Sequence, residues 1–135
     1  MIDDPNAAPK GELTLRTLAM PRDVNTNGDI FGGWVLSQMD MAAGIVAAAR
    51  AQGRVATVAI DAMQFIRPVK VGDVLCIYVH IARIGRTSMG LQIEAWVLRN
   101  RQVQREKVTE GLFTFVAIDE AGRPRPVPPE GEGNS

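Results

Sequence analysis

Residues 32–53 read GGWVLSQMDMAAGIVAAARAQG, and this stretch decides how the rest of the chain is expected to fold. From about Trp34 to Gln52 it contains no proline and is rich in Ala, Leu and Met, residues that favour a helix. After Asp40 it contains a single ionisable residue, and a helix that is apolar nearly all round is typically buried. Gly53 stands where a helix C-cap is expected. The stretch therefore predicts one long central helix, buried by the remaining elements.

The segments on either side of this helix show the patterns of β-strands. One strand is predicted before the helix and four after it, at Glu12–Met20, Val55–Arg67, Val74–Ile84, Thr87–Arg99 and Lys107–Ile118. In the second of these strands, alternation places one set of side chains on a single face, namely Val58, Ile60, Ala62 and Ile66. One helix and about five antiparallel strands predict an α+β domain with the sheet wrapped on the helix. This order of elements is the one that a hotdog fold requires.

The length of the chain indicates one domain, because 135 residues are too few for two ordinary ones. Residues 1–11 are polar and are predicted to form a flexible N-terminal arm. Residues 12–120 are predicted to form the single domain. Residues 121–135 are rich in proline and glycine and are predicted to form a loose C-terminal tail.

Composition and charge exclude several classes of function. Lys+Arg and Asp+Glu each number 15, so the chain has no net charge and lacks the basic field expected of a nucleic-acid-binding protein. The N-terminus has no apolar signal segment and charged or polar residues interrupt every long apolar run, which predicts a cytoplasmic protein without stable membrane insertion. One cysteine and one histidine are too few for a Cys/His metal site, so no metal is expected. The chemistry is therefore expected to rest on carboxylates, amides and backbone groups.

Asp40 is the residue that points most clearly to chemistry. It lies in mid-helix among apolar residues, and burying a carboxylate costs free energy unless the group is paired or functional. Helical spacing places Gly33, Ser37 and Asp40 on one stripe. No Arg or Lys lies three or four residues from Asp40. The alternatives are a functional carboxylate and a structural one bonded to a hydroxyl or backbone group elsewhere.

The loop at residues 22–33, RDVNTNGDIFGG, leads into the helix. Its Asn-Gly and Gly-Gly pairs are both expected to supply positive-φ positions. Unpaired N–H groups at the helix start, beside Gly32 and Gly33, can polarise a carbonyl or stabilise an oxyanion, and an ordinary flexible connection is the alternative. Asn27 is expected to form a turn with the following glycine. Asn25 is less constrained, and its amide can orient a water or hold a carbonyl.

Five cations are expected to lie outside the strand centres, namely Arg67, Lys70, Arg86, Arg123 and Arg125. Arginine in a loop is usually a solvated surface residue, and that alternative applies to each of them. Arg86 is followed by Thr87 and Ser88, so this turn can offer a phosphate one guanidinium and two hydroxyls. It is the best candidate for an anion contact.

One segment resembles a known family. Residues Met20–Asp40, MPRDVNTNGDIFGGWVLSQMD, closely resemble the active-site segment of the hotdog-fold acyl-CoA thioesterases of the bacterial and cytosolic acyl-CoA hydrolase type. The resemblance covers roughly residues 13–128, because four later segments also fall where that family has them: Phe65-Ile-Arg-Pro, Val71-Gly-Asp, Gly85-Arg-Thr-Ser and Phe113-Thr-Phe-Val-Ala. It implies a long helix wrapped by an antiparallel sheet, and assembly as dimers or trimers of dimers. It also implies hydrolysis of acyl-CoA without a metal or another cofactor.

The resemblance implies roles for individual residues by position. Asp40 matches the helix carboxylate that activates a water or attacks the thioester directly. Gly33 matches the backbone donor to the thioester oxygen. Asn25 matches a loop amide that in some relatives faces the carboxylate across a subunit boundary.

The residues expected to contact CoA are basic or hydroxyl-bearing. By resemblance, Arg86, Thr87 and Ser88 match a turn that lies along CoA, and Arg67 matches a CoA contact. Because the chain has no net charge, positive charge must be concentrated locally to bind the phosphates of CoA. Arg125 is therefore also predicted to contribute to CoA binding.

Two alternatives in function remain. A hotdog hydratase or dehydratase usually needs a His paired with a carboxylate, and His80, the one histidine, falls on a predicted strand far from the helix in sequence. A non-catalytic acyl-CoA-binding module would keep the CoA contacts but would not need Asp40.

Overall fold

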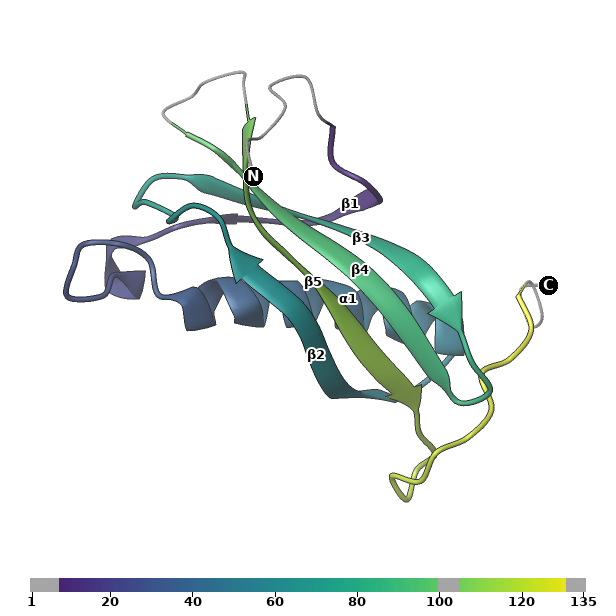
Figure 1. Ribbon diagram of the computed structural model, residues 1–135. Helices are drawn as coiled ribbons and strands as arrows, with labels where there is room; N and C mark the ends of the chain where they lie inside the picture. Colours follow the sequence, from purple (N-terminus) through teal and green to yellow (C-terminus); the bar gives the residue numbers. More distant parts are fainter. Residues whose placement is uncertain (1–7, 100–104, 131–135) are drawn as a thin grey trace.

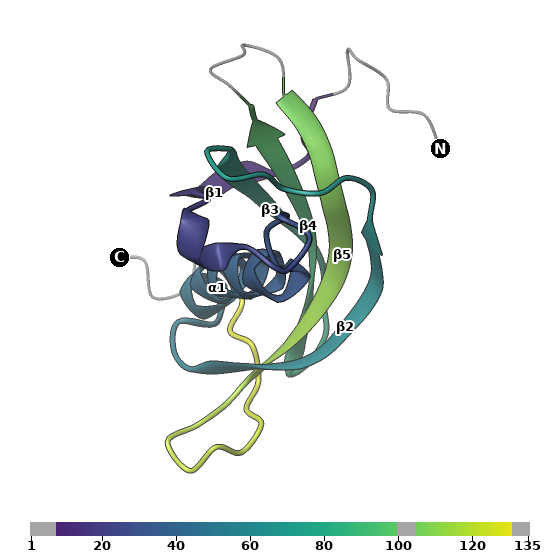
Figure 2. The same cartoon turned by 90° about the vertical axis from the view of Figure 1, so that its left-hand side faces the viewer.

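A curved antiparallel sheet wraps a single long helix in the computed structural model, which describes residues 8–99 and 105–130 (Figures 1 and 2). The elements follow in the order β1 (Glu12–Leu18), the 3-10 turn η1 (Pro21–Asp23), α1 (Gly32–Ala51), β2 (Val55–Phe65), β3 (Val74–Ile84), β4 (Ser88–Leu98) and β5 (Arg105–Ala117). The predicted α+β architecture is confirmed. Within the described ranges, no helix has the length and apolarity needed to cross a membrane.

The five strands form one sheet in the order β1-β3-β4-β5-β2. Strands β3, β4 and β5 follow one another as antiparallel neighbours, whereas β1 and β2, which flank α1 in the chain, form the two edges of the sheet. The prediction of Val74–Ile84 as a strand is confirmed residue by residue, and the other strands differ from prediction by a few residues at their ends. Local sequence patterns locate strands well but not their ends.

The core lies between one face of α1 and the concave face of the sheet. The buried helix residues recur every three or four positions and are mostly small: Val35, Met39, Ala42, Ala43, Ala47 and Ala51. Larger side chains from the sheet pack against them, including Leu75, Ile77, Leu91, Ile93 and Phe113. Because alanine projects so little, the backbone of α1 can lie close to the sheet, and Figure 2 shows the helix end-on inside the curve of the strands.

The helix is not buried all round, so this prediction is wrong for the single chain. Met41 and Ile45 of α1 are 52% and 54% exposed, and Phe31 just before it is 52% exposed. The physical reason is that one sheet covers one side of a helix and the described chain places no second layer on the other side (Figure 2). The outer face of α1 is therefore apolar and open.

Both ends of α1 differ from prediction. The helix begins at Gly32 rather than near Trp34, so the Gly-Gly pair is helical, and in this loop Gly28 has the positive φ, 81°. At the other end Gln52 adopts the left-handed cap conformation, with φ 55°, in place of Gly53. A Cβ at Gly53 would lie 2.6 Å from Nη2 of Arg125, so a larger residue there would require the end of the Arg125 side chain to shift.

Strand β2 departs from regular alternation. Its pairing with β5 shifts register twice, and Ala62 has a φ of 55°, as expected where a strand bulges. As an edge strand β2 is exposed along most of its length, including Val58 at 57% and Ile60 at 40%. The predicted assignment of Val58, Ile60, Ala62 and Ile66 to one face by strict alternation is wrong, because the bulges interrupt it.

Part of the C-terminal segment lies along the domain. The N–H of Arg125 donates to the carbonyl of Ala117 at 2.9 Å, and the N–H of Val127 donates to the carbonyl of Arg86 at 2.8 Å. Arg50 Nη1 donates to the carbonyl of Pro128 at 2.6 Å, which ties this segment to the end of α1. Residues 1–7 of the predicted N-terminal arm, and residues 131–135, lie outside the described residues.

Phe113 tests the core, since its side chain is fully buried between α1 and the sheet. We expect Phe113→Ala to lower the free energy of unfolding by about 3–5 kcal/mol, because it removes a large apolar side chain and leaves a cavity. Urea unfolding followed by circular dichroism at fixed protein concentration measures this change. The matched control is Val71→Ala at a side chain that is 44% exposed, and it should change stability by less than about 0.5 kcal/mol. Equal losses for both variants would contradict this placement of the core.

Candidate active site

Asp40 lies on the side of α1 that faces β2. Its Oδ1 accepts a hydrogen bond from the hydroxyl of Thr57 at 2.7 Å. Thr57 is held in place because β2 pairs with β5, where Phe115 is its partner in the register. The structure thus gives Asp40 a hydroxyl partner, and the bond orients the carboxylate while using only one of its two oxygens.

Thr57 could not be identified from the sequence as the partner of Asp40. The two residues are 17 positions apart, on different elements, and no motif links them. Only the register of β2 against β5, and of the sheet against α1, brings the hydroxyl to the carboxylate. The nearest signal in the sequence is the hydroxyl residue on the strand that follows the helix.

The start of α1 presents backbone donors. The N–H groups of Trp34 and Val35 donate to the carbonyl of Phe31 at 3.1 and 3.4 Å. Those of Gly32 and Gly33 precede these bonds, and in helix geometry they have no carbonyl four residues earlier within the helix. A Cβ at Gly33 would meet nothing within 4 Å, whereas one at Gly32 would lie 3.4 Å from the ring of Phe65. Gly33 therefore faces open space where an anionic oxygen can approach the helix end.

Asn25 organises the loop before the helix. Its Oδ1 accepts from the N–H groups of Asn27 and Asp29, at 2.9 and 3.1 Å. Its own N–H donates to the carbonyl of Asp29 at 2.7 Å. The expectation that Asn25 is less constrained than Asn27 is wrong, because Asn25 is the residue whose side chain closes the turn. Any contact with a substrate would then use its amide nitrogen.

A cavity of about 310 Å³ lies beside the helix start. Its polar lining comes from Asn25, Asp29, Gly32 and Arg67, and its apolar lining from Ile30, Val35, Phe65, Ile66, Pro68, Val69 and Val108. The structure therefore brings the loop amide, the helix N-terminus and one predicted basic residue together. Asp40 is not among the residues of the described chain that line this cavity.

Arg67 is anchored at the cavity by its guanidinium. Nη1 donates to the carbonyl of Lys107 at 3.1 Å, and Nε lies 3.9 Å from Oε2 of Glu106. The side chain is 33% exposed, so part of it remains accessible from the cavity. These contacts fix the position of its positive charge.

The turn at residues 85–88 lies near the other end of α1 (Figure 1). The N–H of Gly85 donates to the carbonyl of Ser88 at 2.7 Å, and the backbone carbonyl of Thr87 accepts from the N–H of Ala117 at 2.9 Å. Arg86 is exposed. A helix of 20 residues spans about 30 Å, so the single chain does not bring this turn to the cavity at the helix start.

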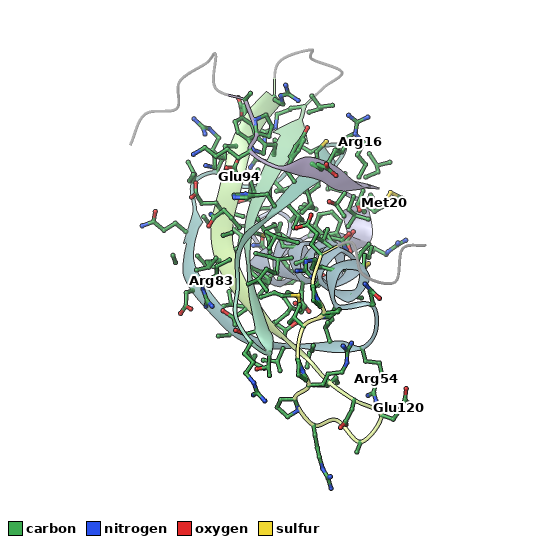
Figure 3. All side chains as sticks on the ribbon, turned by 90° about the vertical axis from the view of Figure 1, so that its right-hand side faces the viewer. Arg16, Met20, Arg54, Arg83, Glu94 and Glu120 are labelled. Atoms are coloured by element: carbon green, nitrogen blue, oxygen red, sulfur yellow. The ribbon has the colours of Figure 1, made fainter. Side chains whose placement is uncertain are left out.

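Arg125 lies at the same end as this turn. Its Nε donates to the carbonyl of Ile118 at 3.0 Å, so its guanidinium helps to hold the C-terminal segment. Nearby, Nη1 of Arg54, in the connection between α1 and β2, donates to the carbonyls of Asp119 and Glu120. Figure 3 shows Arg54 close to Glu120 of the C-terminal segment. Several arginines are therefore concentrated at this end of the molecule.

A family model described as the thioesterase superfamily matches residues 27–104. These residues include the helix start, Asp40, Arg67 and the turn at residues 85–88. The chain belongs to this superfamily.

Curated and solved members of the thioesterase superfamily resemble this chain closely. The acyl-CoA thioester hydrolase YciA of Salmonella typhimurium is 53% identical over 126 residues, which cover 91% of this chain and 95% of that protein. The crystal structure of a hexameric thioesterase from Yersinia pestis superposes with a TM-score of 0.86 at 53% identity, covering 90% of this chain and 99% of that one. A hexameric hotdog-fold thioesterase of Campylobacter jejuni superposes with a TM-score of 0.81 at 35% identity, covering 87% and 91%. The predicted hotdog fold and family are confirmed.

Proposed function

We propose that this protein hydrolyses the thioester of acyl-CoA to a fatty acid and CoA. One observation carries the proposal. Asp40 and Gly33 lie on the same helix, α1, with Gly33 at its N-terminus, and the hydroxyl of Thr57 on β2 orients the Asp40 carboxylate. Relatives that are more than half identical and match nearly the whole chain are named acyl-CoA thioester hydrolases. A carboxylate can activate water or attack a thioester, and backbone N–H groups can stabilise the oxyanion that forms.

In the proposed mechanism, the thioester carbonyl oxygen accepts a hydrogen bond from the N–H of Gly33. The positive end of the α1 dipole stabilises the negative charge that develops on this oxygen. Asp40 either removes a proton from the attacking water or attacks the carbonyl carbon itself. When water attacks, the C–S bond then breaks, the fatty acid is released, and the CoA sulfur takes up the proton that Asp40 removed. When Asp40 attacks, the C–S bond breaks and leaves an acyl anhydride on Asp40, which a water molecule hydrolyses to release the fatty acid while the CoA sulfur takes up a proton from that water. We include in the proposal that no metal or other cofactor takes part.

The proposal places the complete site between two copies of the chain. Within one helix Asp40 lies seven residues beyond Gly33, about 10 Å of helix rise, and it does not line the described cavity that contains Asn25. An Asn25 amide and a Gly33 N–H from one copy, facing Asp40 from a second copy, would bring the three groups to one thioester. Two such sites would form around one two-fold axis.

The exposed apolar surface supports self-association. Met41 and Ile45 on α1, and Val58 and Phe65 on β2, are all more than half exposed. Large side chains of this kind on one helix face and the adjoining edge strand are typical of an interface. We propose that β2 pairs with β2 of a second copy, which satisfies the free strand edge and lays the two helices side by side. A hexamer of three such dimers is part of the proposal, since the relatives from Yersinia and Campylobacter are described as hexameric.

We propose that CoA is held by basic and hydroxyl groups away from the thioester. The turn of Arg86, Thr87 and Ser88 would contact its phosphates, and Arg125 would add positive charge there. Arg67 would contact CoA at the cavity beside the helix start. Because the turn and the cavity lie at opposite ends of α1, a CoA bound at one cavity would meet the turn of another copy.

The position of His80 does not support a hydratase. It lines a different cavity, together with Glu12, Val46, Val79 and Ile81, and none of these residues belongs to the helix start. The proposal also includes a cytoplasmic location, because a chain with a single cysteine is typical of a reducing compartment.

Thiol release from a panel of acyl-CoAs of different chain length tests the function and the role of Asp40 together. We expect the protein to release free CoA from at least one of them. Asp40→Asn should lower kcat by about 100-fold or more, because it removes the group that activates or attacks. The variant should stay folded, since the amide can still accept the hydrogen bond from Thr57.

Glu120→Gln is the matched control, because it neutralises an exposed carboxylate on the C-terminal segment and should leave kcat unchanged. An Asp40→Asn variant that keeps most of the kcat would show that Asp40 is structural. Binding of CoA by the unmutated protein, seen as a rise in Tm, without thiol release from any acyl-CoA would instead indicate a binding module.

Ile45→Glu tests the proposed assembly. A charge on the open face of α1 should prevent close packing of two helices, because it would be buried without a partner. We expect the variant to sediment as a smaller species than the unmutated protein and to lose most of its thiol release, while its circular dichroism spectrum is unchanged. Leu13→Glu, on β1 at the opposite edge of the sheet, introduces the same charge at a 45% exposed side chain and should keep most of the activity. Full activity of an Ile45→Glu monomer would contradict a site shared between copies.

Arg86→Ala tests the proposed phosphate contact. We expect a rise of several-fold in KM for acyl-CoA with kcat nearly unchanged, the pattern of a contact that binds substrate and transition state equally. The rise should shrink for an acyl-pantetheine thioester, which has no phosphates, and should weaken with added salt. Arg16→Ala on β1 removes the same charge from another exposed position and should not change KM. Equal loss on both substrates would mean that Arg86 acts on the fold or on the chemistry.

A further inference from the structure

A partly buried ion pair lies outside the candidate active site and the proposed CoA contacts. Arg99, at the end of β4, donates from Nη2 to Oδ2 of Asp73 at 2.9 Å and from Nε to Oδ1 and Oδ2 at 3.1 and 3.2 Å. The Asp73 side chain is 2% exposed and that of Arg99 is 25% exposed. Such a pair contributes little net stability compared with apolar side chains of the same size, because two charges lose their hydration. Its position in the fold is therefore more informative than its strength.

The guanidinium group of Arg99 also binds both ends of the loop that follows β2, at Pro68 and at Asp73. Its Nη2 donates to the carbonyl of Pro68 at 3.0 Å. The carboxylate that it binds accepts a further hydrogen bond from the N–H of Lys70 at 2.8 Å, through Asp73 Oδ2. Because one planar guanidinium holds Pro68 and Asp73 at once, the loop between them has a fixed shape.

This loop forms one wall of the cavity and also holds the segment before α1. Pro68 and Val69 line the cavity, and the carbonyl of Val69 accepts from the N–H of Ile30 at 2.9 Å. Ile30 is 5% exposed and stands two residues before the helix begins at Gly32. A continuous chain of hydrogen bonds and covalent bonds thus runs from Arg99, through Pro68 and Val69, to the helix start.

The same guanidinium is linked to the basic residue at the cavity. Arg99 Nη1 donates to Oε2 of Glu106 at 3.3 Å, and this oxygen lies 3.9 Å from Nε of Arg67. One carboxylate, that of Glu106, therefore lies between Arg99 and Arg67.

The charge on Arg99 is secure. The hydrogen bond that Arg99 donates to Asp73 is the main cause that raises the pKa of Arg99 above its ordinary value. Burial opposes this rise, and the nearby negative charges of Asp73 and Glu106 add to it. Since the folded-state pKa lies above the unfolded one, this stabilisation is present below the unfolded pKa and is lost only at more alkaline pH. Arg99 stays positively charged at every pH that an assay would use.

We propose that Arg99, together with Asp73, is a positioning residue that sets the start of α1 against the cavity wall, and so places the Gly33 N–H for the reacting carbonyl. This inference rests on the proposed thioesterase function. It assigns to the pair an effect on the chemical step, through the loop at residues 68–73, and not a contact with substrate.

Arg99→Lys is the informative change, because lysine keeps the positive charge but cannot bind Asp73, Pro68 and Glu106 at once. We expect kcat for thiol release to fall about tenfold, the effect of misplacing an oxyanion donor without removing it. KM should change less than kcat, because the turn of Arg86 at the other end of α1 is untouched and Arg67 keeps its hydrogen bond to the carbonyl of Lys107. Assays are made well below the Tm of each variant, so that only folded protein contributes.

Glu94→Gln is the matched control for a buried carboxylate. Glu94 is 5% exposed and accepts from Nε1 of Trp96 at 2.9 Å, but it lies on the face of β4 turned away from α1 (Figure 3). The Glu94→Gln variant should have a lower Tm and an unchanged kcat. The double variant Asp73→Asn/Arg99→Lys should lose no more kcat than Arg99→Lys alone, because both changes break one linkage.

Hydrogen exchange of the assembled protein gives a readout that does not depend on catalysis. In Arg99→Lys, peptides that cover residues 24–36 should exchange at least about fivefold faster, because the Ile30 bond is weakened. Peptides from β3 should keep their rates. Unchanged exchange at residues 24–36, or a kcat within twofold of the unmutated protein, would overturn the proposal. Absence of thiol release from the unmutated protein would overturn the proposed function, and the exchange result would still decide whether Arg99 positions the helix start.

Discussion

The contact between the alanine face of α1 and the concave sheet is the constraint on which the rest of the structure depends. Ala42, Ala43 and Ala47 are fully buried, and their small side chains let the helix backbone approach the strands. A larger side chain at any of them would push the helix outward and open the curve of the sheet. Because the helix lies this close, Asp40 reaches the hydroxyl of Thr57 and the helix start reaches the loop after β2.

The same arrangement leaves apolar side chains exposed on the outer face of α1 and on β2. A single sheet covers a single side of α1, and β2 at the edge of that sheet has its pairing groups open along one side. The helix is apolar on nearly all sides, and its two faces have different surroundings. One face packs on the sheet of its own chain, and the other, with Met41 and Ile45, is suited to a second copy. In the proposed assembly the site lies along this boundary, between two copies of the chain.

Charged groups in this neutral protein are placed by the fold and not by local sequence. Asp73 and Arg99 are 26 residues apart, yet they meet because β3 begins beside the place where β4 ends. Their contact joins the sheet to the loop that supports the helix start. The arginines near the opposite end of α1 gather in the same way, through the turn at residues 85–88 and the C-terminal segment that hydrogen-bonds to it. Two ends of one helix thus have different electrostatic surroundings.

The sequence by itself determined the element types, their order and the family, since helix propensity, strand patterns and the run from Met20 to Asp40 are local properties. It also indicated Asp40 and Gly33, because an unpaired carboxylate in an apolar helix and a glycine pair at its start stand out without any structure. Tertiary structure decided the open outer face of α1, the bulges of β2, and the partners of Asp40 and Arg99. These depend on register and layer packing between segments far apart in the chain, and no local pattern records which residues such packing brings together.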